Sequence, residues 1–167
     1  MRRPFLALTM LALPALVAAG CGGGSKSTST SNQSTATKSS ASTASAATIG
    51  VRKTGLGTIL VDSTGRTLYL FEKDKGDKSS CSGACASAWP PLTTTSKPKP
   101  ATGISAALLG TSARPDGTKE VTYNGHPLYT YAGDAAPGDT TGEGLKQFGA
   151  EWYALSPQGK KVEHGGS

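Results

Sequence analysis

Short runs of branched and aromatic residues, separated by turn residues, dominate the chain after residue 47. Residues 58–61 and 67–71 are two such runs, and 62–65 between them have the composition of a turn. Because side chains alternate along a strand, Tyr69 and Phe71 are expected on one face and the leucines beside them on the other. A strand that is apolar on both faces is typical of the interior of a sheet.

The same pattern returns in the second half of the chain. Residues 120–123 and 127–131 are again rich in branched and aromatic residues. Asn124 and Gly125 separate these runs, and this dipeptide is a strong signal for a hairpin. Near the end, residues 156–159 predict a type I turn between two further short strands.

The two halves are similar to each other at an offset of 60 residues. The register then slips by three, so that Trp89 pairs with Trp152 and Leu92 with Leu155. The pairs at the first offset are Ile49-Gly50 with Leu109-Gly110, Gly57-Thr58 with Gly117-Thr118, Val61 with Val121, Gly65 with Gly125, Leu68-Tyr69 with Leu128-Tyr129, Phe71 with Tyr131 and Asp74 with Asp134. The chain is therefore expected to hold two copies of one unit.

These elements predict an all-β fold. Two copies of a β-meander-type repeat, about 48–92 and 108–155, are expected to pack into one small sandwich- or barrel-like domain with one or two short helical turns. Helical turns are expected at 84–88 and 105–109, and a Pro/Lys/Thr-rich connection occupies 93–103. A copy of about 45 residues rarely buries an adequate core alone. The copies should therefore pack their aromatic faces against each other and share one core.

The first 20 residues predict export. After a cationic start, residues 5–19 are mostly apolar but too short to span a bilayer, as in a signal peptide. Small residues precede Cys21, and this arrangement resembles the bacterial lipobox, in which the cysteine is diacylated and becomes the new N-terminus. Two acyl chains suffice for stable anchoring. The alternative is an ordinary secretory signal that is cleaved near Cys21.

The segment after Cys21 predicts a tether. Residues 22–47 contain 9 Ser and 5 Thr in 26 positions and no apolar residue larger than Ala. A segment of this composition cannot bury enough apolar surface to offset the entropy lost on ordering. Residues 21–47 are therefore expected to be a lipidated cysteine and a disordered tether. Its reach is roughly 25–30 Å. Residues 48–167 remain, enough for a single β domain but not for two.

The charge distribution argues against a nucleic-acid partner. The chain carries a formal net charge of +6, but residues 48–167 hold 13 Lys and Arg against 11 Asp and Glu. Four of the excess charges lie at Arg2, Arg3, Lys26 and Lys38, outside the predicted domain. The domain thus lacks the basic patch that nucleic-acid binding needs.

The chain has three cysteines, and the lipid would use Cys21. Cys81 and Cys85 remain, and export favours a disulfide between them. Their C-x3-C spacing differs from the C-x-x-C of thioredoxin-like sites. A structural staple is the favoured interpretation, with a redox-active pair or a metal site as alternatives. A metal would need further ligands, and the chain has only two histidines, His126 and His164.

Residues 69–74 and 129–134 both fit the pattern Y-x-(F/W/Y)-x-x-D. Together with the lipobox, Trp89-Pro90-Pro91-Leu92 and residues 152–157, this motif resembles the bacterial predicted-lipoprotein family known as the secreted repeat of unknown function. The resemblance covers nearly the whole domain and implies a lipid-anchored extracytoplasmic β-repeat protein without an established activity. The motif residues are Tyr69, Phe71, Asp74, Tyr129, Tyr131 and Asp134, and Trp89 and Trp152 are further repeat aromatics.

Each motif residue has a structural and a functional interpretation. Asp74 and Asp134 follow strands and are expected to cap turns with their carboxylates; ligand binding is the alternative. The motif tyrosines are expected in the core, while a stacking surface for sugars or a Tyr/Trp electron relay are the alternatives. His126 follows a turn glycine and is expected to be an exposed turn residue rather than a catalytic base.

The sequence carries no signature of an enzyme, such as G-x-S-x-G, H-E-x-x-H or a P-loop. We therefore expect no catalytic residue, metal or cofactor. The favoured function is a binding or interaction module, lipid-anchored through Cys21 on the extracytoplasmic face of a bacterial membrane. Its partner would be an envelope component, a small ligand or a protein. The alternative is a redox or metal-handling lipoprotein that uses Cys81 and Cys85 or the repeated aromatics.

Overall fold

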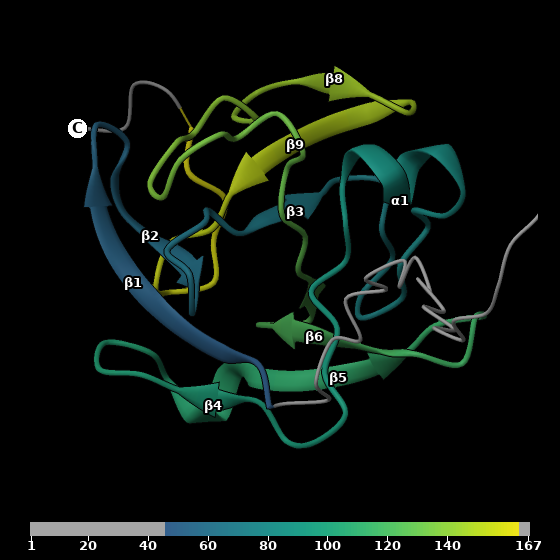
Figure 1. Ribbon diagram of the computed structural model, residues 1–167, viewed down its shortest axis with the longest axis horizontal. Coiled ribbons are helices and arrows are strands. Elements are labelled where there is room, and N and C mark those ends of the chain that lie inside the picture. The colour runs from purple at the N-terminus through teal and green to yellow at the C-terminus, as the bar shows by residue number, and fades with distance from the viewer. Residues whose placement is uncertain (1–45, 164–167) are drawn as a thin grey trace, which may run out of the picture. The chain divides into compact units, whose positions relative to one another are not determined.

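The computed structural model describes residues 46–163, and Figure 1 shows their arrangement. The predicted signal peptide, Cys21 and nearly all of the predicted tether lie outside the described residues. The elements are β1 (Thr48–Thr54), β2 (Gly57–Asp62), β3 (Tyr69–Phe71), α1 (Ala84–Ala88), β4 (Lys99–Pro100), the 3-10 turn η1 (Ala106–Leu108), β5 (Leu109–Ala113), β6 (Lys119–Tyr123), β7 (His126–Pro127), β8 (Lys146–Gln147) and β9 (Ala150–Ala154).

The all-β prediction is confirmed. The strands form three small sheets with the orders β2-β1-β4, β3-β9-β8 and β5-β6-β7, and none of these sheets closes into a barrel. The two short helical turns lie where the sequence predicted them. Among residues 46–163, no helix has the length and hydropathy of a membrane span.

The predicted offset of 60 is wrong for one strand of the repeat. In the β1–β2 hairpin four residues lie between the paired Lys53 and Thr58, whereas in the β5–β6 hairpin five lie between Ala113 and Lys119. The turn that follows is one residue shorter in the second copy, which restores the original offset. Strand β2 therefore corresponds to β6 at an offset of 61, so the matches of Val61 with Val121 and of Gly57-Thr58 with Gly117-Thr118 do not hold.

The corrected register is supported by the bonds that the two copies exchange. The last segment of each copy pairs with strands of the other copy, so each copy receives one strand segment from the other. The four bonds run from the Val121 amide to the Leu92 carbonyl (2.8 Å), Leu92 to Leu128 (2.8 Å), Leu60 to Leu155 (2.8 Å) and Leu155 to Leu68 (3.2 Å). Leu60 and Val121 occupy equivalent places in this scheme.

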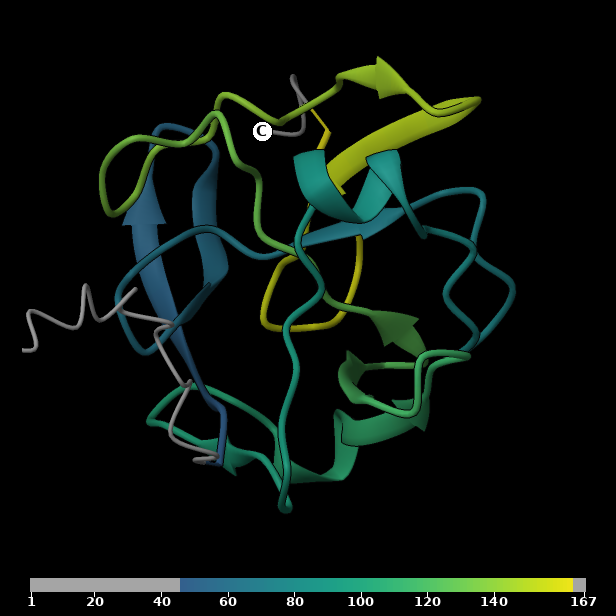
Figure 2. The same ribbon diagram turned by 45° about the vertical axis from the view of Figure 1, so that its right-hand side comes forward.

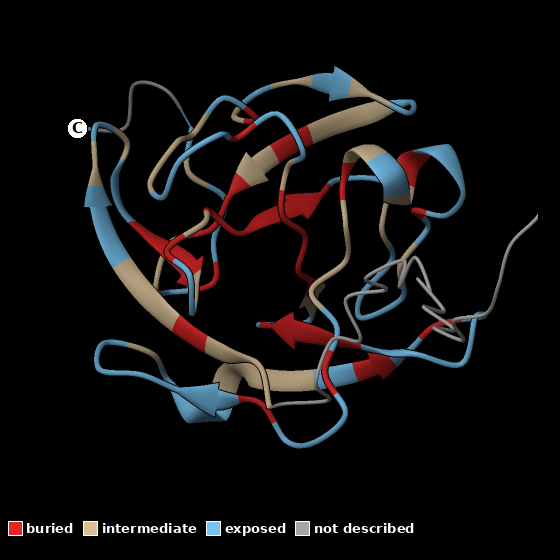
Figure 3. Ribbon diagram, in the orientation of Figure 1, coloured by how far each residue is buried: buried red, intermediate tan, exposed pale blue. Residues whose placement is uncertain are grey.

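The core has an aromatic and an aliphatic part, and strand β3 contributes to both. Tyr69 and Phe71 belong to the aromatic cluster, and Leu68 and Leu70 to the aliphatic one, as the alternation predicted. Each cluster includes residues from both copies. Figure 3 shows the buried segments β3 and β6 near the centre of the described domain. The two copies thus share their core.

Candidate functional site

The motif tyrosine of each copy binds the motif aspartate of the other. The Tyr69 hydroxyl donates to Asp134 Oδ2 at 2.8 Å, and the Tyr129 hydroxyl donates to Asp74 Oδ2 at 2.7 Å. The two tyrosines also exchange backbone bonds of 2.8 and 3.0 Å. The Y-x-(F/W/Y)-x-x-D motif is therefore a device that joins two copies.

The second oxygen of each aspartate caps a loop, in agreement with the structural interpretation. Asp74 Oδ1 accepts bonds from the amide and hydroxyl of Ser80, at 2.7 and 2.8 Å. Asp134 Oδ1 accepts the same pair from Thr141, at 3.0 and 2.6 Å. The capped residues lie six and seven positions beyond the aspartates, so each carboxylate holds a whole loop rather than a single tight turn.

Burial of the tyrosine rings raises the pKa of both phenols, Tyr69 and Tyr129, and the neighbouring carboxylates raise each pKa further. Both hydroxyls therefore stay protonated and remain hydrogen-bond donors. This is the state that the aspartates need, because a carboxylate can only accept.

Four aromatic rings form a continuous stack across the junction between the copies. The Phe71 ring stacks on Trp152 at 4.0 Å between centroids, Trp152 on Trp89 at 3.9 Å, and Trp89 on Tyr131 at 4.3 Å. The outer rings are equivalent in the two copies, as are the two indoles. Each such pair adds about 0.5–1.5 kcal/mol beyond its area of burial.

The stack is part of the core. Trp89 and Trp152 are fully buried, and the two motif tyrosines pack edge-on against them. Tyr131 is half-buried and is the most accessible member. The aromatic residues found by sequence thus come together, but they do not present a stacking surface for sugars.

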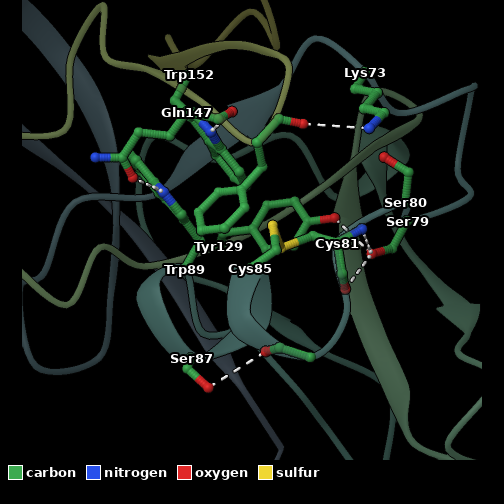
Figure 4. Close-up of a disulfide and its surroundings, with 12 residues drawn as sticks. Lys73, Ser79, Ser80, Cys81, Cys85, Ser87, Trp89, Tyr129, Gln147 and Trp152 are labelled. Carbon is green, nitrogen blue, oxygen red and sulfur yellow. Dashed lines mark hydrogen bonds between the residues drawn. A yellow bond between two sulfur atoms is a disulfide. The ribbon is translucent and has the colours of Figure 1, made fainter.

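The predicted disulfide between Cys81 and Cys85 is confirmed. It ties the start of α1 to the preceding loop, beside the aromatic rings (Figure 4). Cys81 is 1% and Cys85 6% exposed, which favours a structural staple over an exchange-active pair.

The second copy closes the corresponding loop with a glycine instead. The Gly142 amide lies 3.3 Å from the Tyr69 hydroxyl, as its donor. A Cβ atom at Gly142 would come within 3.0 Å of Tyr69 and Trp89 side-chain atoms, so a side chain cannot fit without displacing these rings. The loop with the disulfide lies beside Tyr129 and the loop with Gly142 lies beside Tyr69, so equivalent tyrosines are held by different contacts.

A buried ion pair is the largest feature that sequence reasoning missed. Glu120 on β6 occupies the place that Ile59 holds in the first copy, and it is fully buried. Arg114 Nη1 donates to Glu120 Oε2 at 2.5 Å, while Arg114 Nη2 donates to the Cys81 carbonyl at 2.7 Å. Burial raises the pKa of Glu120 to about 7, and Arg114 acts in the opposite direction.

Ser79 connects this ion pair to the motif. Its Oγ accepts from Arg114 Nη1 at 2.7 Å and lies 2.7 Å from the Tyr129 hydroxyl oxygen. A continuous polar network thus joins Asp74, Tyr129 and Ser79 to the buried ion pair. Through the bonds of Arg114 to Ser79 and to the Cys81 carbonyl, this network attaches the disulfide loop to the β5–β6 hairpin.

A surface cavity of about 470 Å³ opens beside the first motif. Its wall includes the acids Glu72 and Asp74 and the bases His126 and Lys161, above the leucine and phenylalanine of β3. Lys161 Nζ lies 2.9 Å from Glu72 Oε1 and 2.7 Å from a Glu163 carboxylate oxygen. The cavity therefore presents charges of both signs. Among residues 46–163, no group of three His, Cys, Asp or Glu side chains could hold a metal ion.

Comparison with known proteins identifies the repeat. A family model described as a secreted repeat of unknown function matches residues 50–93 and 110–156. These two ranges coincide closely with the two copies seen in the structure. The chain matches no curated protein and no solved structure.

Proposed function

Since the chain belongs to the family of the secreted repeat of unknown function, we propose that it is a membrane lipoprotein whose domain acts as an extracytoplasmic binding module. Acyl chains on Cys21 would anchor it to the outer side of a bacterial membrane, and residues 22–47 would tether the domain. Support for the anchor comes from the apolar N-terminal segment and the small residues before Cys21.

The binding role rests on the surface cavity. The buried motif rings are occupied with joining the two copies, whereas the cavity is open and lined by ionisable groups. Glu72 and Asp74 suit a cationic group, while Lys161 and His126 suit an anionic or hydroxyl group. We propose a small polar ligand that carries groups of both kinds, with no catalytic step.

Native mass spectrometry of the lipoprotein purified from its own envelope tests this proposal. We expect a bound small molecule on the wild-type chain and its loss from Lys161→Gln. Lys160→Gln is the matched control, because Lys160 is the exposed neighbour and does not line the cavity. A ligand retained equally by both variants would place binding elsewhere, and a ligand-free wild-type chain would contradict the small-molecule role.

One observation favours a second candidate, an extracytoplasmic redox protein. The tryptophan stack lies in the same cluster as the disulfide and ends at the half-buried Tyr131. Thiol titration of the native protein after mild reduction separates the candidates. A disulfide that resists reduction until the protein unfolds agrees with a staple, and rapid reversible reduction in the folded state supports the redox candidate.

A further inference from the structure

The surface cavity lies on the first copy of the repeat, and the second copy can be compared with it residue by residue. Three residues of the cavity wall have counterparts at an offset of 60, namely Phe71 with Tyr131, Asp74 with Asp134 and His126 with Arg66. The backbone supports the last of these matches. The Asp62 amide bonds to the Arg66 carbonyl at 2.9 Å, and Tyr123, which is equivalent to Asp62 in the corrected register, pairs with His126.

Arg66 occupies the equivalent place in the second copy. Its Nη2 donates to the Tyr131 carbonyl at 2.6 Å, and the same carbonyl accepts the Asp134 amide at 3.2 Å. Arg66 Nε is buried, so this part of the guanidinium is shielded from water. The second copy therefore holds a guanidinium group of its own against the carbonyl at the third position of its motif.

In the first copy the matching carbonyl is that of Phe71. It accepts the Asp74 amide at 3.0 Å, and within the described part of the chain no side chain donates to it. The Glu72 amide bonds to the Glu151 carbonyl at 3.1 Å, so by the alternation of an antiparallel ladder the Phe71 carbonyl points away from β9. His126 lines the cavity, but its side chain is shorter than that of arginine. The first copy thus has the acceptor without the guanidinium.

The first copy also has an additional acid at this place. Glu72 lines the cavity, whereas the equivalent residue in the second copy is Ala132. Figure 2 shows the C-terminal segment, in yellow, passing beside β3, and this segment brings Lys161 to within 2.9 Å of Glu72. Lys161 also lies 2.7 Å from Glu163, so its positive charge is offset. With Asp74 as a further acid, the wall suits a cation.

We propose that the cavity binds a ligand through a guanidinium group, in the place that Arg66 fills in the second copy. This inference rests on the proposed binding role of the cavity and names the chemical class of its ligand. The fixed fork of a guanidinium can donate to the Phe71 carbonyl and to the Glu72 carboxylate, whereas an ammonium group is a compact point charge. Lys161 remains available for an anionic group elsewhere on the ligand.

Free arginine is the probe, because it carries a guanidinium and a carboxylate. Calorimetric titration of the full processed lipoprotein in detergent should show one arginine per chain, and lysine should bind at least about tenfold more weakly. Acetyl-arginine amide, which has no carboxylate, distinguishes two sources of the group. Affinity equal to that of arginine indicates an arginine side chain of a peptide, and weaker binding indicates a free small molecule. Absence of binding by both arginine compounds, or equal binding of lysine, overturns the proposal.

His126→Arg should close the cavity from within, as Arg66 does in the second copy. We expect arginine binding to fall by more than about tenfold, with an unfolding midpoint that is not lowered. Gln158→Arg is the matched control, because it adds the same charge at an exposed residue outside the cavity wall and should change the affinity by less than about twofold. Unchanged binding by a folded His126→Arg chain would contradict the proposal.

Glu72→Gln tests the acid without filling the cavity, and it serves as the second variant if His126→Arg does not fold. Arginine should bind about tenfold more weakly to this variant. Asp77→Asn removes an equal charge from an exposed residue that does not line the cavity, and it should alter the affinity by less than about twofold. Equal losses in the two variants would indicate general attraction of cations and would overturn the proposal.

The guanidinium assignment and the binding role can fail separately. Native mass spectrometry of the purified lipoprotein could show a ligand without a guanidinium group that is lost from Lys161→Gln. This result would overturn the assignment and leave the binding role intact. A wild-type chain that carries no ligand and binds no arginine would contradict both.

Discussion

The two copies of the repeat share the same strands and motif bonds, but the loop after the motif is held in place differently in each copy. The first has a disulfide and a helical turn beside the partner's tyrosine, and an isoleucine at position 59 on its second strand. The second has Gly142 in the loop and the charged Glu120 on the strand. The shared features are the tyrosine–aspartate bonds and the stacked rings. The comparison indicates that the junction between copies defines the repeat, while each loop is secured independently.

The strongest way to break this arrangement is to remove a ring at the junction. Trp152→Ala should lower the free energy of unfolding by about 3–5 kcal/mol, because it leaves a cavity in a core that both copies share. Chemical denaturation followed by circular dichroism should show one transition. Gln158→Ala is the control and should change stability by less than about 0.5 kcal/mol, since this side chain is exposed. Two separate transitions for Trp152→Ala would disprove the shared core.

Making the second copy resemble the first should reveal the role of the ion pair. Glu120→Ile alone should cost about 3 kcal/mol or more, because the buried Arg114 then keeps only the exposed Asp116, 3.5 Å from its Nε, as an acid partner. Combining it with Arg114→Met should recover most of that loss. Urea denaturation of the single and double variants measures the difference. No recovery in the double variant would mean that Arg114 stabilises mainly through Ser79 and the Cys81 carbonyl.

The two tyrosine–aspartate bonds should differ in strength. Tyr69→Phe and Tyr129→Phe each remove a donor from a carboxylate and should each cost about 2–3 kcal/mol. The loss should be larger for Tyr129, because the second contact of its hydroxyl, with Ser79 Oγ, is 2.7 Å long, whereas the second contact of the Tyr69 hydroxyl, with the Gly142 amide, is 3.3 Å long. Thermal unfolding of the two variants side by side gives the comparison, and a larger loss for Tyr69 would contradict it.

The disulfide should matter less than the junction. Replacing both cysteines by Cys81→Ala and Cys85→Ala should cost about 2 kcal/mol, since the closed loop is short. The circular dichroism spectrum should stay β-type, because the second copy holds its corresponding loop without a disulfide. Calorimetry measures the shift. Complete unfolding would show that the first copy, unlike the second, depends on its covalent link.

The last expected effect is a dependence of stability on pH that comes from Glu120 in the second copy. The pKa of Glu120 is about 7 in the folded chain and lies near 4.5 for a free glutamate, so the folded state binds more protons between these values. Its contribution to stability should therefore fall as the pH rises from about 4.5 to about 7. Glu120→Gln should flatten this part of the profile of unfolding midpoint against pH. An unchanged profile would assign the titration to another group.

Local features of the fold were predictable from the sequence. The alternation around Tyr69, the turn at Asn124 and the staple at Cys81 depend on neighbouring residues, and each agrees with the structure. The register of β6 was not predictable, because a one-residue insertion and a compensating deletion lie in two different loops. A fixed offset conceals such a pair of changes.

The site was harder to predict than the fold. The motif was found, but its pairing across copies depends on contacts between residues 55 and 65 positions apart. The one sequence signal of a buried charge was the position of Glu120 at the start of an apolar run. Its partner Arg114 lies in a loop whose sequence has no recognisable pattern.

Because the terminal segments are exchanged, hydrogen bonds would still join the two copies if the link between them were cut after folding. Residues 101–103 in that link are exposed, and a single cut at the peptide bond between Thr102 and Gly103 would leave two fragments. Each fragment would still supply the other with a strand segment, a tyrosine and an aspartate. We expect the two fragments of the cut protein to remain together as a noncovalent complex. Once separated, neither fragment should fold until it binds the other.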